Sequence, residues 1–182
     1  WDEPNAAANG TEHLTAIAGQ YSKEKKQGFL LGYQRYGRLC FQVGTGEEWL
    51  TLWADSENLH KYEWNHVAAV FDGKSGDMSL YLNGELAGER SIDTGAAIAP
   101  AEKEKLLIGK NAHGESIAAG SYQMFSGYMD ELKLYGKALD KETIAAQASF
   151  RAPEIAYEDI GLQNILTEDI YKTQFHGGPY QH

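Results

Sequence analysis

The sequence has 182 residues, a hydrophobic share of 42% and a formal net charge of −10. That length supports one hydrophobic core and little more, and an acidic surface repels phosphate, which makes nucleic acid an unsuitable partner. No apolar run approaches the roughly 18 residues that a membrane-spanning helix needs, so no membrane span is predicted. The single cysteine, Cys40, excludes an internal disulfide, and its place in an apparent strand predicts a small buried side chain.

The first part of the chain differs in character from the rest. Residues 1–27 are mostly polar, with one short apolar stretch at 15–18, and we expect them to be loop. The mixed-charge run at 23–26 is typical of a solvated loop. After residue 27, apolar and β-branched runs alternate with glycine-rich turns, a pattern that predicts strands. The first of these predicted strands cover 28–33, 38–43 and 48–53.

The middle of the chain gives the clearest pattern. An apolar run at 64–71 and an alternating run at 78–82 predict two strands, and Asn83-Gly84 is a strong signal for a tight hairpin into a strand at 85–90. Further strands are predicted at 106–109 and 127–135. Asp140 can cap a short helix over 141–148. The predicted fold class is therefore all-β, an antiparallel β-sandwich with one short C-terminal helix and an extended tail, with residues 1–150 as the sandwich and 151–182 as a linker.

Two segments carry a family resemblance. Residues 64–73 with 78–84, and residues 125–135 with 138–140 and the helix, resemble the central hairpin and the closing strand of laminin-G-like, concanavalin-A-like jelly rolls. The resemblance covers about residues 12–149 and implies a module that binds sugars, proteins or nothing. It also implies that Trp64 is a packing residue. Because the family's opening strand ends at a residue such as Trp1, the resemblance further implies that this strand lies upstream of the 182 residues.

The tail carries a second resemblance. Residues 165–182 resemble the lead-in to a five-bladed propeller glycoside hydrolase of the family 32 type, which acts on fructosides. This implies that the chain is the N-terminal accessory module of a secreted or cell-surface bacterial enzyme, with the adjacent catalytic domain as a partner. The fragment itself is predicted to be non-catalytic. Glycosidase chemistry needs two carboxylates held across a sugar, and the adjacent pair Asp130-Glu131 would point to opposite faces of a strand.

Asp130 is the predicted metal ligand. Jelly rolls of the resembled kind often hold a structural Ca²⁺, and Ca²⁺ takes six to eight oxygen ligands, so Asp130 would need other carboxylates or loop carbonyls. The alternative is that Asp130 accepts backbone hydrogen bonds at a strand end. Calcium is thus the only cofactor that the sequence indicates.

A stripe of aromatic residues forms the predicted carbohydrate site. Trp49, Thr51 and Trp53 share one face of a strand while Leu50 and Leu52 share the other, so core-facing leucines leave both tryptophans on the outer face. Flat rings of this kind stack against sugars. The predicted carbohydrate-binding residues are Trp49, Trp53, Tyr33, Tyr36, Arg35 and Tyr62. Two alternatives stay open: the same face docks against the catalytic domain, or the register is reversed and the tryptophans face the core.

The sequence therefore predicts a non-catalytic accessory module that binds carbohydrate or braces a catalytic domain. The alternative function is an extracellular protein-interaction module of the laminin-G type.

Overall fold

A computed structural model describes residues 14–55, 57–61, 63–111, 125 and 127–149 of the protein. The chain divides into two compact units, Trp1–Ser149 and Phe150–His182. The second unit lies wholly outside the described residues, and so do the predicted tail and linker.

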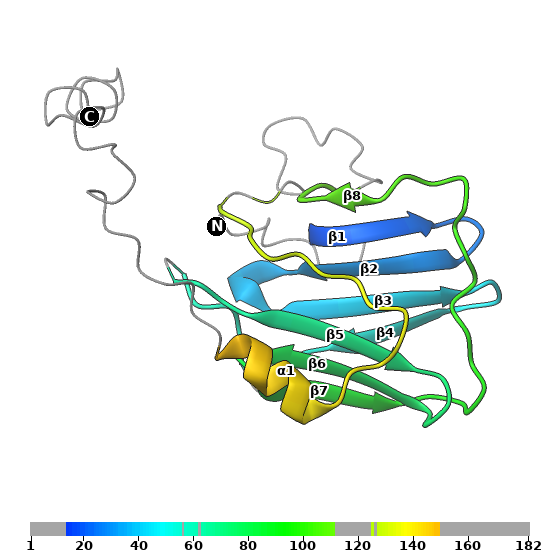
Figure 1. The fold of residues 1–182 in the computed structure, drawn as a ribbon. Coiled ribbons are helices and arrows are strands. Elements are labelled where there is room, and N and C mark those ends of the chain that lie inside the picture. Colours follow the sequence, from blue (N-terminus) through cyan, green and yellow to red (C-terminus); the bar gives the residue numbers. More distant parts are fainter. Residues whose placement is uncertain (1–13, 56, 62, 112–124, 126, 150–182) are drawn as a thin grey trace, which may run out of the picture. The chain divides into compact units, whose positions relative to one another are not determined.

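The larger sheet has five antiparallel strands in the order β4-β3-β2-β1-β8 (Figure 1). Their bounds are β1 Thr15–Ser22, β2 Gln27–Tyr33, β3 Leu39–Thr45, β4 Trp49–Trp53 and β8 Leu107–Ile108. A 3₁₀ turn, Arg35–Gly37, joins β2 to β3, and Tyr36 within it has a left-handed φ of 61°. Neighbouring strands are joined by short turns, which explains the up-and-down order of β1 to β4.

The smaller sheet has three antiparallel strands in the order β5-β6-β7. They are β5 Val67–Asp72, β6 Asp77–Leu82 and β7 Glu85–Ser91. The predicted hairpin between β6 and β7 is confirmed: Asn83 and Gly84 have φ values of 53° and 89°, the positive values that a type I′ turn requires. The helix α1, Lys141–Ala148, is also confirmed, and the side chain of its N-cap residue Asp140 accepts a hydrogen bond from the Thr143 N–H at 2.7 Å.

The two sheets pack face to face around one main core. Its buried residues come from both sheets: Tyr33, Leu39, Phe41, Val43, Leu50, Leu52, Ala54, Leu59, Met78, Leu80, Leu82 and Ala87. Contacts between strands of different sheets are made mainly by β6 and β7 against β3 and β4. The predicted fold class, an antiparallel sandwich of the jelly-roll type with one short helix, is therefore confirmed. In the described part of the chain, no helix is long and apolar enough to cross a membrane.

Two predictions about the elements were wrong. Residues 15–22, expected to be loop, form β1, which pairs with both β2 and β8. Residues 127–135, expected to be the last long strand, form no strand although the structure describes all of them. The physical reason is that a strand needs a ladder partner. Residues 15–22 find two partners, and residues 127–135 pair with none of the described strands.

Candidate functional site

The outer face of the five-stranded sheet carries the predicted tryptophans. Burial along β4 alternates, with Leu50 and Leu52 only 7% and 4% exposed in the main core while Trp49, Thr51 and Trp53 are half-buried. The predicted register of this strand is therefore confirmed, and the reversed alternative is wrong. The tryptophans are less exposed than free surface residues, because both pack against a second buried cluster on this outer face: Leu14, Ala16, Tyr21, Leu30 and Cys40.

Glycines position Trp49. The register places Tyr21, Gly28, Gly44 and Trp49 in one row across β1 to β4. With two side chains absent between them, the rings of Tyr21 and Trp49 meet edge to face, with centroids 6.1 Å apart. The indole N–H of Trp49 also donates to the Lys23 carbonyl at 3.4 Å. Trp49 is therefore fixed along one edge and half-buried.

Polar side chains lie between the two tryptophans. Gln42 stands opposite Thr51 in the ladder, and its amide Nε2 donates to the Thr51 hydroxyl at 3.1 Å. The guanidinium of Arg90, from β7, donates to the backbone carbonyl of Thr51 at 2.9 Å. The Thr51 hydroxyl oxygen accepts the hydrogen bond from Gln42. The hydroxyl hydrogen of Thr51 can therefore be donated to another oxygen atom.

The other end of the stripe is basic and aromatic. Arg38 lies over the ring of Trp53, 5.3 Å from its centroid. Arg38 also donates to the Ala54 carbonyl at 2.8 Å and forms an ion pair with the exposed Asp55 at 3.3 Å. Cys40 stands opposite Trp53, fully buried, and burial raises the pKa of its thiol, which keeps it an unreactive packing group, as predicted.

The remaining predicted sugar contacts divide into three groups. Tyr36 is 53% exposed on the turn between β2 and β3. Tyr33 was predicted to contact sugar, but it is fully buried in the main core against Phe125, with ring centroids 6.2 Å apart, so it presents no surface to a ligand. The Arg35 side chain and Tyr62 lie outside the described residues.

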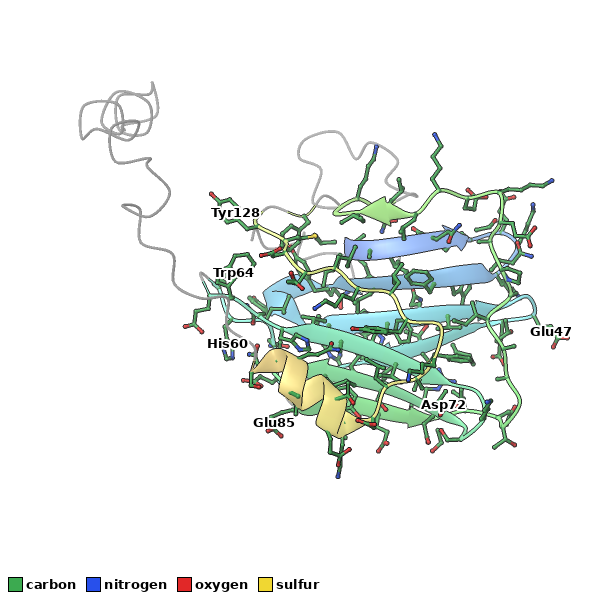
Figure 2. The ribbon with its side chains drawn as sticks, in the orientation of Figure 1. Glu47, His60, Trp64, Asp72, Glu85 and Tyr128 are labelled. Atoms are coloured by element: carbon green, nitrogen blue, oxygen red, sulfur yellow. The ribbon has the colours of Figure 1, made fainter. Side chains whose placement is uncertain are left out.

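Two exposed aromatic residues were missed. Trp64 was predicted to be a packing residue, yet it is 71% exposed, and Tyr128 is 88% exposed. Figure 2 shows both at the same end of the molecule, near His60. The His60 ring contacts Glu57 at 2.8 Å and Glu63 at 3.5 Å. No sequence pattern distinguishes Trp64 from a buried tryptophan, because its exposure depends on distant strands.

The described residues around Asp130 do not by themselves form a calcium site. Asp130 is exposed, and its carboxylate accepts the N–H of Glu131 at 2.8 Å. Glu131 is itself paired with Lys133 at 2.7 Å. Among the residues that the structure describes, no group of three or more acidic, histidine or cysteine side chains could hold a metal ion. Calcium at Asp130 would need ligands from outside them, and it stays a prediction.

Comparison with known proteins places this geometry in a wider context. The chain is 25% identical over 117 residues to the pentraxin-related protein PTX3 of Mus musculus, an alignment that spans 63% of this chain and 29% of the mouse protein. The chain thus covers less than a third of that relative's length.

Two solved structures have a similar fold. The heptameric SAP-like pentraxin of Limulus polyphemus superimposes with a TM-score of 0.52 and 19% identity, over 74% of this chain and 62% of that one. The CBM40 of the Ruminococcus gnavus IT-sialidase superimposes with a TM-score of 0.57 and 17% identity, over 74% of this chain and 73% of that one. At identities of 19% and 17%, these superpositions show a similar fold and nothing more. The family model of the concanavalin A-like lectin/glucanases superfamily matches residues 1–145, and the chain belongs to this family.

Proposed function

We propose that the protein is a carbohydrate-binding module and that the outer face of β3 and β4 contacts the sugar. The observation that carries the proposal is the stripe on β4, in which Trp49 and Trp53 flank Thr51 on the face turned away from the main core. A sugar ring presents C–H groups on its faces and hydroxyls on its rim. Half-exposed indoles can pack against the faces, and a polar row between them can bind the rim.

The polar groups of this stripe are held in place before any ligand arrives. The bonds from Gln42 and Arg90 fix Thr51 at the centre, while the contacts of Arg38 with Trp53 and Asp55 fix the end of the stripe. A site ordered in this way loses little conformational entropy on binding. The described side chains on this face of β3 and β4 include no carboxylate, which favours binding over glycoside hydrolysis, a reaction that needs a carboxylate pair.

Family membership and one structural neighbour support the proposal. The family description names lectins and glucanases, both of which bind sugars. The Ruminococcus gnavus neighbour is the CBM40 of a sialidase, a module attached to an enzyme that acts on sugars. Such modules belong to proteins that meet polysaccharides outside the cell, so we also propose a secreted or cell-surface location.

The proposal is tested by electrophoresis in gels containing soluble polysaccharides, including a fructan, or by a glycan array. We expect one glycan class to retard the protein and the Trp49→Ala/Trp53→Ala double variant to lose at least tenfold in affinity, about 1.4 kcal/mol, since both flat contact faces of the proposed site are removed. Trp64→Ala is the matched control, because it removes an exposed indole from another part of the molecule. The same runs with EDTA test whether the retardation needs the predicted Ca²⁺. If the folded wild-type protein binds no glycan, the proposal fails.

A second role rests on another observation. Residues 165–182, outside the described residues, resemble the lead-in to a family 32 propeller enzyme, and the rings of Trp53 and Trp49 are already partly covered by Arg38 and Tyr21. We therefore propose, as the alternative role of this face, that the module serves a bacterial glycoside hydrolase and that its outer face braces the catalytic domain instead of binding sugar.

The test of this second role is fructan hydrolysis by the native protein, isolated from its source with an antibody against this chain. Release of fructose supports the accessory role. A native protein that releases no sugar but captures other proteins would instead support an interaction module of the laminin-G type.

A further inference from the structure

The two tryptophans of the proposed sugar site are four residues apart on one strand. Trp49 and Trp53 are the first and last residues of β4, and both lie on its outer face. A strand rises about 3.3 Å per residue, so the two positions are roughly 13 Å apart along β4. A sugar ring is about as wide as the six-membered ring of an indole. One sugar, or two linked neighbours, therefore cannot contact both tryptophans.

The contacts around each indole keep this separation fixed. The Tyr21 ring meets Trp49 edge to face, with centroids 6.1 Å apart, and the indole N–H of Trp49 donates to the Lys23 carbonyl at 3.4 Å. At the other end of the stripe, the Arg38 guanidinium lies 5.3 Å from the centroid of the Trp53 ring. Both indoles also pack against the buried cluster on this face. The two rings therefore cannot swing together onto one sugar without losing these contacts.

Polar groups fill the interval between the two indoles. The Thr51 hydroxyl, at the middle of β4, accepts from Gln42 and keeps its own hydrogen for donation. The Arg90 guanidinium donates to the Thr51 carbonyl at 2.9 Å, and it forms no ion pair with any described residue. A guanidinium has five N–H donors, so further donors remain beside the stripe for the oxygens of a sugar. The stripe therefore offers an aromatic, a polar and an aromatic contact in one line.

We propose that this site binds an internal stretch of a linear glycan, at least three sugar residues long, extended along β4. One sugar stacks on Trp49, another stacks on Trp53, and the sugar between them binds Thr51 and Arg90. Because the contacts lie in a line on one strand, both ends of the glycan can continue past the stripe. The substrate class is the interior of a linear polysaccharide, as opposed to the terminal sugar of a branched glycan. This inference rests on the proposed sugar site and goes beyond it in stating the length and kind of glycan.

The test is isothermal titration calorimetry with oligosaccharides of increasing length, from one to six residues. The probes are size ladders of linear β-glucan, xylan and fructan, and of any further polysaccharide that retards the protein in gels. For a ladder that binds, the affinity per binding register should rise about tenfold or more between the disaccharide and the tetrasaccharide. The reason is that the longer chain makes its second indole contact within the same complex. Beyond the length that spans the stripe, the affinity should level off.

Two variants assign the length dependence to the tryptophans. Trp49→Ala removes one stacking face, so the tetrasaccharide should bind no more tightly than the disaccharide. Trp64→Ala is the matched control, because it removes an exposed indole outside the stripe, and it should keep the rise seen with the unaltered protein. If Trp49→Ala does not fold, the ladder measured on the unaltered protein still decides the question.

Two outcomes would overturn this inference alone. A monosaccharide that binds as tightly as the hexasaccharide would show that the site takes the end of a glycan. A length dependence that persists in Trp49→Ala would place the second contact away from that indole. If neither the oligosaccharides nor the polysaccharides bind, the proposed function itself fails, and the inference fails with it.

Discussion

The two sheets of this protein differ in how completely they are packed. In the five-stranded sheet both faces carry buried clusters, the main core on the inner face and the Tyr21 cluster on the outer face. In the three-stranded sheet the inner residues of β6 are buried, but every residue of β5 is half-buried and its outer edge is open among the described residues. The larger sheet is therefore packed on both faces, whereas β5, at the edge of the smaller sheet, is packed less completely among the described residues.

The largest effect is expected inside the larger sheet. Tyr33→Ala removes a fully buried ring that packs on Phe125, and we expect a loss of about 3–5 kcal/mol in the free energy of unfolding. Trp64→Ala removes a larger ring that is 71% exposed, and it should change stability by no more than about 0.5 kcal/mol. Urea-induced unfolding of both variants measures the difference. Equal losses would contradict the description of Trp64 as a surface residue.

The next largest loss of stability is expected where the backbones of β1 and β2 approach each other closely. In Gly28→Ala the new Cβ would lie 1.8 Å from the Gln20 carbonyl oxygen, and φ is +85°. The strands must separate, so the loss should exceed the roughly 1–2 kcal/mol that a left-handed φ alone costs. Gly95→Ala is the matched control, since φ is +86° there and no atom lies within 4 Å of the new Cβ. Thermal unfolding should rank Gly28→Ala well below Gly95→Ala, and the reverse order would argue against the β1–β2 register.

A smaller effect is expected at the helix C-terminal to residues 127–135. Asp140→Ala removes the acceptor for the Thr143 N–H and should lower Tm by a few degrees. Asp140→Asn keeps an acceptor oxygen at the same place and should retain most of the stability. Thermal melts followed by circular dichroism compare the two. If the alanine variant melts like the wild type, α1 contributes little to the stability of the smaller sheet.

The smallest effect concerns pH and the start of β5. Burial, and then the charge of Lys133, lower the pKa of His66 from its ordinary value of 6.5. Because the folded state favours the neutral ring, the stability that His66 contributes is complete above pH 6.5 and is lost as the pH falls through the lower folded value. Between pH 7.5 and 5, Tm should therefore fall less for His66→Gln than for the wild type, as thermal melts at the two pH values measure. Parallel curves for the two proteins would show that His66 does not titrate differently on folding.

Local chemistry explains which features the sequence could predict. The Asn83-Gly84 hairpin, the α1 cap and the alternation along β4 each depend on residues a few positions apart, and all three are confirmed. The same reasoning could have predicted that Tyr33 is buried. Phe29, Leu31 and Tyr33 occupy alternate positions along β2, so all three side chains lie on the face toward the main core. The sugar-site prediction erred there by counting aromatic residues without following the strand.

Other features depend on distant parts of the chain. The strand β1 is buried on both faces, so it shows no polar and apolar alternation. Residues 127–135 are rich in apolar and aromatic residues but pair with none of the described strands, and pattern alone cannot show whether a neighbouring strand is present. The exposure of Trp64 likewise depends on parts of the chain that are distant in sequence. The scaffold of the candidate site was thus predictable from β4, whereas the contacts that Tyr21 and Arg38 make with its tryptophans required the fold.

The four tryptophans of the sequence allow the proposed sugar site to be tested in one experiment. The indole N–H signals of the ¹⁵N-labelled protein, assigned with single Trp→Phe variants, are followed as the glycan found in the gel assay is added. We predict that the signals of Trp49 and Trp53 shift together, with one saturation curve, while that of Trp64 stays in place. A shift of Trp64 with Trp49 and Trp53 unchanged would contradict the proposal and move the sugar site away from β4.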